Sequence, residues 1–211
     1  MQELEYGNKT GINRDLDSPV YIDRFASFLK PHSYILEYGC NSGGLLNALK
    51  DYHFINLIGY DFSESKINQG RKLHPDLDLR ILKESGKIPM QNESIDAVVL
   101  SSILCSLTEE QKQLQLIIEI FRVLKKHGIL YLSDFLINHD EFHKEKYKIG
   151  FKEYGEWGLY TTDDKLLVRH HSTKAIMSLL NNFDIQWFEQ FDFKIMNQNP
   201  TRTFHCIAQK N

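Results

Sequence analysis

Residues 34–44 read Tyr-Ile-Leu-Glu-Tyr-Gly-Cys-Asn-Ser-Gly-Gly, and this stretch decides the fold. An apolar run that ends in an acid, then glycines, then a Leu/Ala-rich pattern predicts a buried strand, a sharp loop and a helix start. Glycine has no Cβ, so the backbone can turn tightly and a ligand can lie against it. Asn41 stands inside the turn, and asparagine tolerates a positive φ better than most residues. Free N–H groups at the start of the helix favour a polar or anionic group.

A second acid follows a second short apolar run. Leu57–Tyr60 is followed by Asp61, about twenty residues beyond the glycine loop, which is the spacing at which an acid meets a ribose in dinucleotide-binding folds. A carboxylate only accepts hydrogen bonds, and a 2′,3′-diol offers two donors side by side. The alternative is that Asp61 or Ser63 merely caps a helix over 63–74. We favour the ribose role because a predicted strand precedes the acid.

The remaining pattern predicts alternating strands and helices. Helices are expected over 19–30, capped by Ser18-Pro19, and over 43–51, 63–74, 108–126 and 172–181. Strands are expected at 77–82, 95–100, 129–135, 185–194 and 202–209. Thr108 is the expected cap of the longest helix, with Gly128 just beyond its end and with a buried stripe of Leu114, Ile117, Phe121 and Leu124. Asp96 begins a strand, so it lies far from the ligand end and is expected to be structural.

Glu37, Gly39, Asn41 and Gly43 resemble the first motif of the class I S-adenosylmethionine-dependent methyltransferases, with asparagine in place of the middle glycine. Residues 88–100 and 121–130 are similar to two further segments of that family. The resemblance implies an α/β fold: a Rossmann-like three-layer sandwich with a mostly parallel seven-stranded sheet and a C-terminal antiparallel hairpin. One methyltransferase domain is expected over residues 1–211. Residues 1–30 form an N-terminal cap segment and helix, and 1–17 are either a flap over the cofactor or a loose terminus.

The same resemblance implies S-adenosyl-L-methionine as the cofactor. Glu84 and Ser85 take the places that meet the adenine in the family, although the triplet departs from the usual one at Lys83 and Ser85. The family's pattern places cofactor-binding positions on the glycine turn and on the ends of the following strands. These positions are Glu37, Gly39, Cys40, Asn41, Gly43, Asp61, Phe62, Glu84, Ser85 and Ser101.

Residues 138–171 are polar and aromatic, and are expected to be an insertion after the fifth strand. In the resembled family, substrate-recognition elements commonly lie there, and aromatic side chains supply contact area at low entropic cost. Tyr154, Trp157 and Tyr160 are therefore the expected substrate-binding residues. The alternative is a small satellite core, in which about half of the aromatic residues of this segment only pack.

Two pairs of histidines lie in or beside this segment. His170 and His171 are candidate general bases, because imidazole titrates near neutrality, but neighbours in an extended chain point in opposite directions. A surface or capping role is the alternative that we favour. His139 and His143 have the spacing of a helical metal pair, but no recognised pattern completes it, so a solvated helix start is expected and no metal.

Composition limits the function classes. The formal net charge is −3, which offers no broad attraction to nucleic acid or to an anionic membrane. The three cysteines lie far apart, which indicates free thiols in a reducing compartment, so a cytoplasmic location is expected. The oligomeric state stays open.

The expected activity is methyl transfer to a small molecule, driven mainly by proximity and orientation. The alternatives are a non-catalytic S-adenosylmethionine-binding or interaction domain and a nicotinamide-dependent oxidoreductase. Asn41 and the final hairpin argue against the oxidoreductase.

Overall fold

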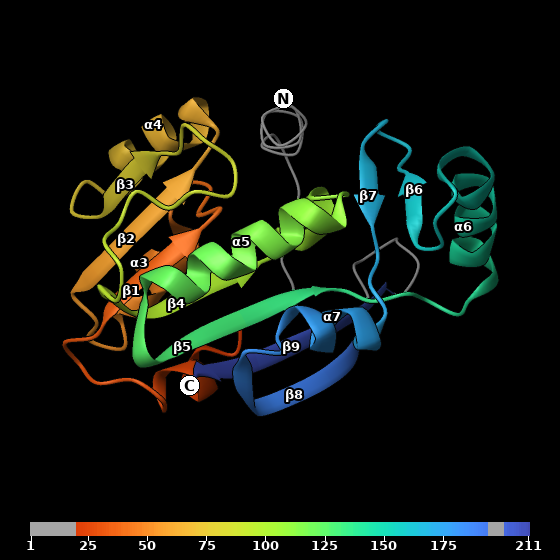
Figure 1. Cartoon of the computed structure of the whole chain (residues 1–211). Helices are drawn as coiled ribbons and strands as arrows, with labels where there is room; N and C mark the ends of the chain where they lie inside the picture. The colour runs from red at the N-terminus through yellow and green to blue at the C-terminus, as the bar shows by residue number, and fades with distance from the viewer. Residues whose placement is uncertain (1–19, 194–200) are drawn as a thin grey trace.

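The computed structural model describes residues 20–193 and 201–211, and a seven-stranded sheet in the order β3-β2-β1-β4-β5-β9-β8 runs through it (Figure 1). The first five strands are parallel, whereas β9 runs antiparallel to both β5 and β8. The strands are β1 Tyr34–Tyr38, β2 Asn56–Asp61, β3 Asp78–Ile81, β4 Ile95–Ser101, β5 Leu124–Phe135, β8 Phe183–Phe193 and β9 Thr201–Lys210. This arrangement confirms the predicted fold class, including the C-terminal hairpin.

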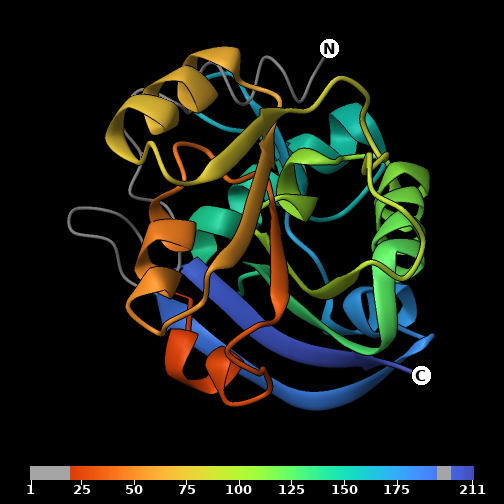
Figure 2. The same cartoon turned by 90° about the vertical axis from the view of Figure 1, so that its left-hand side faces the viewer.

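Helices cover both faces of the sheet, and Figure 2 shows α3 and α4 on one side and α5 on the other. The helices of the first face are α2 Ile22–Ala26, α3 Gly44–Lys50 and α4 Glu64–Leu73, and those of the second are α5 Glu110–Val123 and α7 Thr173–Leu179. The central strands therefore bury side chains in both directions, as in β4, where Ala97, Val98 and Val99 are fully buried. A sheet covered on both faces explains the near-continuous apolar runs of the sequence.

The first described helix is shorter than predicted. It spans Ile22–Ala26 instead of 19–30, with Tyr21 as its N-cap; the Ser18-Pro19 cap lies outside the described residues. The following N–H groups, of Phe28 and Leu29, bond to the carbonyls three residues back, so the chain continues in tight turns. The predicted apolar face is confirmed, because Phe25 is buried and Ile22 and Leu29 pack against the same core.

The predicted bounds of the long helix were wrong, and its predicted buried stripe was right for Ile117, Phe121 and Leu124 but wrong for Leu114. α5 ends at Val123 because Leu124 already pairs with Ile95 of β4, so the residues around Gly128 belong to β5 and not to a helix cap. Glu109, not Thr108, is its N-cap. The buried stripe contains Gln113, Leu116, Ile117, Ile120 and Val123, while Leu114 is exposed. Ile118 is exposed on the same face as Leu114, so the helix carries apolar residues on its exposed face as well as on its buried face. The spacing of apolar residues alone therefore does not identify the buried face.

The segment after β5 forms a small structure of its own. It contains α6 Glu141–Tyr154 and an antiparallel pair, β6 Leu159–Thr161 and β7 Leu167–Arg169, on the right of Figure 1. A separate apolar cluster of Tyr147, Tyr160, Leu166 and Val168 holds these elements together. The chain returns through a parallel bridge between Leu136 and His171. The satellite core, which was the alternative for this segment, is therefore present.

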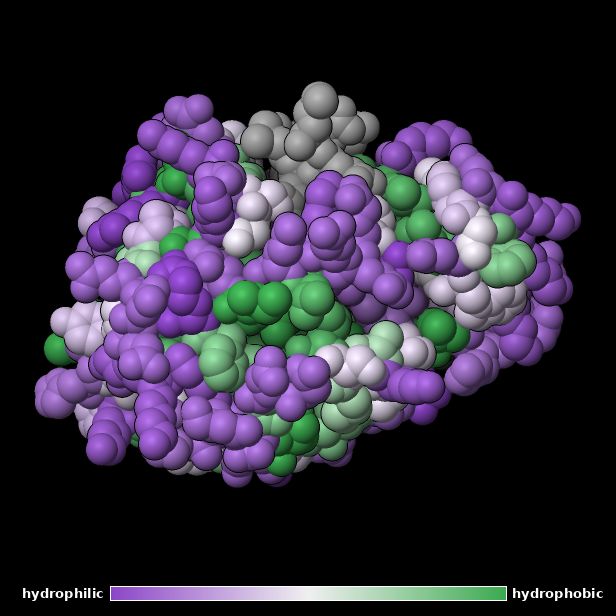
Figure 3. Space-filling model, in the orientation of Figure 1, coloured by the Kyte–Doolittle hydropathy of each residue, from purple (hydrophilic) through white to green (hydrophobic). Residues whose placement is uncertain are grey.

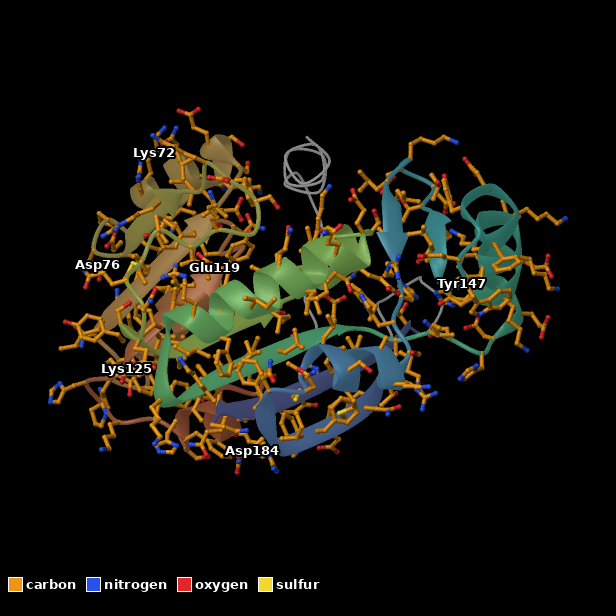
Figure 4. All side chains as sticks on the ribbon, viewed as in Figure 1. Lys72, Asp76, Glu119, Lys125, Tyr147 and Asp184 are labelled. Carbon is orange, nitrogen blue, oxygen red and sulfur yellow. The ribbon has the colours of Figure 1, made fainter. Side chains whose placement is uncertain are left out.

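Asp96 lies where the sequence predicted, at the start of β4. Its carboxylate accepts a hydrogen bond from the backbone N–H of Tyr34 at 2.8 Å and pairs with Lys125 at 2.8 Å. Lys125 is labelled in Figure 4 at the end of the sheet where β5 begins. The Asp96 side chain joins three neighbouring strands, which is a structural role.

The face of the molecule in Figure 3 is mostly hydrophilic, with its broadest hydrophobic area near the middle and smaller ones around it. Leu114 and Ile118 of α5 are the large apolar side chains most exposed on that helix. No helix in the described part of the chain has the length and apolar character to cross a bilayer.

Candidate functional site

A turn of left-handed residues follows β1. Gly39, Asn41 and Gly43 have φ angles of 80°, 53° and 82°, so the predicted positive φ of Asn41 is confirmed. The N–H groups of Gly39 and Cys40 both donate to the carbonyl of Tyr60, at 2.7 and 3.0 Å, which ties the turn to β2. Gly43 is the N-cap of α3 and has no side chain to accept from the helix. We name residues 39–43 the glycine turn.

Close packing accounts for the glycine at the first position of this turn. A Cβ on Gly39 would lie 2.2 Å from Cδ1 of Ile103, which follows β4. Such an approach is far inside van der Waals contact, and the positive φ adds strain for any side chain. The end of β1 and the loop after β4 therefore meet with bare backbone on one side.

Asp61 joins two loops at the end of β2. One carboxylate oxygen accepts from the backbone N–H of Asn41 at 2.8 Å, and the other accepts from the N–H of Ser63 at 2.7 Å. The helix-capping role belongs to Ser63, whose hydroxyl accepts from Lys66 N–H at 3.4 Å. Each carboxylate oxygen can accept more than one hydrogen bond, so Asp61 retains acceptor capacity for a diol.

Negative charge gathers around the glycine turn. Burial raises the pKa of the Cys40 thiol, and the charges of Glu37 and Asp61 raise it further. Burial also raises the pKa of Asp61, against the opposing effect of the N–H groups of Ser63 and Asn41. The Glu37 side chain is buried at the end of β1. Cys40 is thus an unreactive thiol between two carboxylates, and the pair favours a ligand that carries positive charge and hydroxyl donors.

The loop after β4 forms the other wall of this region. The hydroxyl of Ser101 lies 2.8 Å from that of Ser133 on β5, and Ser102 has a φ of 55°. A short 3-10 helix, η1 Leu104–Ser106, follows. These residues follow the carboxyl end of β4, which is paired with β1, at the edge where open α/β sheets bind ligands.

Asp134 is a buried carboxylate that the sequence reasoning missed. It accepts from its neighbour Phe135 N–H at 2.7 Å and from Cys105 N–H of η1 at 3.2 Å. Burial raises the pKa of Asp134 to about 7. The available signal was an acid near the carboxyl end of an apolar strand, the same signal that singled out Glu37 and Asp61.

The structure places the other predicted cofactor residues near the strand ends in different environments. Phe62 packs edge-on against Tyr38, with 6.3 Å between ring centroids. Glu84 and Ser85 are exposed, and Glu84 forms a surface ion pair with Lys87 at 2.6 Å. The next residue, Gly86, donates its N–H to the hydroxyl of Tyr38 at 3.4 Å, which brings this loop to the end of β1.

The candidate bases are both buried and point to different partners, as expected of neighbours in an extended chain. His170 Nδ1 lies 2.7 Å from the hydroxyl of Tyr147, and its Nε2 lies 3.1 Å from that of Tyr160. His171 Nε2 lies 2.9 Å from the side-chain nitrogen of Gln113. Burial lowers both pKa values, that of His171 to about 4. Both rings are therefore neutral at pH 7, and the expected surface position is wrong for both.

The predicted substrate-binding residues differ in exposure: Tyr160 is buried, Tyr154 is partly buried and Trp157 is exposed. Tyr160 is buried beside His170, and the hydroxyl of Tyr154 lies 2.8 Å from that of Thr161. Trp157 is 46% exposed, and its ring centroid lies 5.6 Å from that of Tyr147. Trp157 thus offers the largest exposed aromatic surface of the three.

The expected solvated helix start at His139 and His143 is wrong in one respect. His143 is buried beside the rings of Tyr147 and His170, and its Nδ1 lies 2.7 Å from the carboxylate of Asp140, which is also the N-cap of α6. Within residues 20–193 and 201–211, no cluster of three His, Cys, Asp or Glu side chains has the arrangement of a metal site.

Comparisons with known proteins agree with this geometry. The family model described as a methyltransferase domain matches residues 36–132. A solved S-adenosylmethionine-dependent methyltransferase from Methanosarcina mazei has a TM-score of 0.82 at 22% identity, over 89% of this chain and 96% of that one. No curated protein shows a significant match to the sequence.

Two other solved structures show how widely the fold is used. A [4+2]-cyclase, SpnF, has a TM-score of 0.65 at 15% identity, over 89% of this chain and 81% of that one. A putative methyltransferase of Haloferax volcanii, solved with the activator Trm112, has a TM-score of 0.61 at 15% identity, over 89% and 88% of the two chains. At such identities these likenesses establish the fold alone.

The family match covers the glycine turn, Asp61 and the loop after β4, which are the parts of the chain that carry the site. Residues 36–132 therefore match a methyltransferase domain, and S-adenosyl-L-methionine is the cofactor that such a domain implies.

Proposed function

We propose that this protein transfers a methyl group from S-adenosylmethionine to a small-molecule acceptor. The observation that carries the proposal is the arrangement at the end of β1, where left-handed backbone lies between the carboxylates of Glu37 and Asp61. Bare backbone lets a nucleoside approach closely, and the acids match the hydroxyl and ammonium groups of this cofactor. The formal net charge of −3 argues against a nucleic-acid acceptor.

The proposal gives the cofactor one orientation. Asp61, with acceptor capacity left on both oxygens, would receive the ribose hydroxyls, and Glu37 would face the methionine ammonium group. Glu84, Ser85 and Phe62 would border the adenine, and Ser101 would lie toward the sulfur. The glycine turn, including Cys40 and Gly43, would lie along the part of the cofactor between its ribose and its ammonium group.

The bound cofactor supplies an electrophilic methyl group on a positively charged sulfur. The leaving thioether is neutral and needs no proton, so the protein's contribution is to align the acceptor and to exclude water. We propose that the segment 138–171, with Trp157 as its exposed aromatic side chain, forms the acceptor side of the site. Tyr154 and Tyr160 would then stabilise that segment through their contacts with Thr161 and His170.

A base is needed only for an acceptor that loses a proton on methylation. His170 would be the candidate, since His171 is tied to α5 through Gln113. Both nitrogens of His170 lie within hydrogen-bond distance of tyrosine hydroxyls, so a proton would have to leave through Tyr147 or Tyr160. Methylation of an unprotonated nitrogen or sulfur would require neither a base nor a route for the proton.

Calorimetry tests the first part of the proposal. The purified protein should bind S-adenosylmethionine and its demethylated product, S-adenosylhomocysteine, but not NAD. Binding of NAD alone would contradict it and would favour an oxidoreductase. If S-adenosylmethionine binds and a broad screen of acceptors yields no S-adenosylhomocysteine, the non-catalytic binding domain becomes the better description.

A further inference from the structure

Asp134 is a buried carboxylate to which the proposed chemistry assigns no role. Its side chain is only 2% exposed. The groups that stabilise its ionised form are the N–H groups of Phe135, Cys105 and Leu104 and the thiol of Cys105. Two of these residues begin η1, so this acid on β5 holds the short helix that follows β4.

The segment that Asp134 holds, residues 101–107, touches the glycine turn. Ile103 occupies the space where a side chain on Gly39 would begin, since a Cβ there would lie 2.2 Å from its Cδ1. Ser102 is in the left-handed region, at φ 55°, and its carbonyl lies 3.3 Å from the sulfur of Cys105. A conformation of this kind persists only where its surroundings hold it.

A second contact closes the same segment from the other side. The amide nitrogen of Gln113 donates to the carbonyls of Leu104 and Leu107, at 3.1 and 2.6 Å. The N–H groups at one end of η1 therefore meet Asp134, and the carbonyls meet α5. Of these two contacts, the one through Asp134 depends on a charge.

We propose that Asp134 is a positioning residue for the cofactor: its ionised carboxylate keeps residues 101–107, and with them Ile103, against the glycine turn. The inference rests on the proposed placement of S-adenosylmethionine at that turn. An ionised carboxylate only accepts hydrogen bonds, so it suits a ring of N–H donors. A protonated acid or an amide presents a donor to the same groups and loses one of these contacts.

The carboxylate titrates in an accessible range, because burial raises its pKa to about 7. The ionisable groups on the elements packed around it are outside that range or paired. Burial lowers the pKa of His171 and of His205 on β9, each to about 4, and lowers that of His170 as well. The remaining groups are the Cys105 thiol, which hydrogen-bonds to the carbonyl of Ser102, and Arg169, which pairs with Glu110 and Glu156. Protonation of Asp134 is then the charge change expected beside this segment near neutral pH.

The test compares S-adenosylmethionine binding by the wild-type protein and by Asp134→Asn, using calorimetry between pH 6 and pH 8.5. At pH 8.5 the wild type should bind about tenfold more tightly, which corresponds to about 1.4 kcal/mol. The ratio of the two affinities should fall toward one at pH 6, where the wild-type carboxyl is itself protonated. Using the ratio removes the titration of the cofactor and of Asp61, which both proteins share.

Asp96→Asn is the matched control, because Asp96 also binds a backbone N–H but lies at the opposite end of the sheet. Its affinity ratio to wild type should not change with pH. A ratio for Asp134→Asn that is constant across the pH range would overturn the proposal, and so would equal binding at pH 8.5. Absence of S-adenosylmethionine binding by the wild type at every pH would overturn the proposed function as well.

A measurement on the wild type keeps the inference testable if Asp134→Asn does not fold. In protein labelled with 13C at the aspartate carboxyl carbons, saturation with S-adenosylmethionine should lower the pKa of Asp134. The reason is linkage: a ligand that binds better to the ionised form favours ionisation. An Asp134 pKa that S-adenosylmethionine leaves unchanged would refute the positioning role.

Discussion

At the scale of single residues, the site depends on backbone conformations that few side chains tolerate. Gly39 combines a left-handed φ with a neighbour at 2.2 Å from the place of its Cβ, so two independent constraints act on one position. Asn41 needs only the first of them, at a φ of 53°, and an asparagine is sufficient there. The departure from the usual glycine at position 41 therefore has a physical explanation.

Gly39→Ala should destabilise the protein. The new methyl group must displace Ile103 while the backbone stays in a strained region, and each such strain costs about 1–3 kcal/mol. Urea denaturation should show this loss in the free energy of unfolding. Gly44→Ala is the control, because no heavy atom lies within 4 Å of its Cβ position and the residue starts α3. Equal stability of the two variants would contradict the packing argument.

Asp61→Ala should weaken S-adenosylmethionine binding by about 1.5–3 kcal/mol, the range for hydrogen bonds to a charged group. Part of this loss would come from the N–H groups of Asn41 and Ser63, which donate to the carboxylate in the wild type and lose this partner in the variant. Calorimetry measures the effect directly. Asp78→Ala removes an exposed acid that pairs with Arg80 of the same strand, β3, which lies beside β2, so it should leave the affinity unchanged. An unaltered affinity in Asp61→Ala would rule out the ribose contact.

At the scale of elements, the segment after β5 is organised by a polar centre as well as by apolar packing. Tyr147 of α6 is fully buried, and Figure 4 shows it on the side of the helix that faces the rest of the molecule. Its hydroxyl accepts from Asn138 N–H at 3.1 Å and lies 2.7 Å from His170. Burial raises its pKa to about 12. The tyrosine therefore stays neutral and joins α6 to the chain on both sides of it.

Tyr147→Phe should cost about 1–3 kcal/mol in the free energy of unfolding, because it leaves the buried N–H of Asn138 without its partner and removes the nearer of two partners of the His170 Nδ1. Tyr154→Phe makes the same chemical change on the same helix, at a hydroxyl whose partner is the exposed Thr161. That control should lie within about 0.5 kcal/mol of the wild type. Chemical denaturation of both variants decides whether the polar centre stabilises the segment.

At the scale of the whole molecule, burial of neutral histidines links stability to pH. Burial lowers the pKa of His171 and of His205 to about 4, and lowers that of His170 too. The ordinary pKa of histidine is near 6.5, so between pH 4 and pH 6.5 the unfolded chain binds protons at these residues and the folded protein does not. This stabilisation is complete above pH 6.5 and is lost as the pH falls toward 4. Asp134 acts in the opposite direction, because its folded pKa is raised.

His205→Gln isolates one of these contributions. The variant should lose less stability than the wild type between pH 6.5 and pH 4.5, by up to about 1.4 kcal/mol per pH unit, the value for one proton. Urea denaturation at several pH values gives both slopes, and the effect of Asp134 cancels between them. His53→Gln is the control, because it removes an exposed histidine. Parallel slopes for His205→Gln and wild type would contradict the burial argument.

The amino-acid sequence by itself determined the order and type of the main elements, the glycine turn and the antiparallel hairpin. These features depend on local chemistry: apolar runs, left-handed positions and an acid at a strand end. The ends of the elements were less well determined. Leu124, for example, continues the apolar spacing of a helix in the sequence, but in the structure it pairs with β4 as part of a strand. Which face of α5 is buried also depended on the sheet, since apolar residues lie on both sides of that helix.

Only the tertiary structure decided which polar side chains are buried and what they contact. His170, His171 and Asp134 are distant from their partners Tyr147, Gln113 and Cys105 along the chain, so no local pattern could pair them. Burial depends on the assembled layers, and burial sets the protonation of these groups. The sequence located the strand ends where a ligand can bind, and the packing of loops around those ends determined the charges that it would meet.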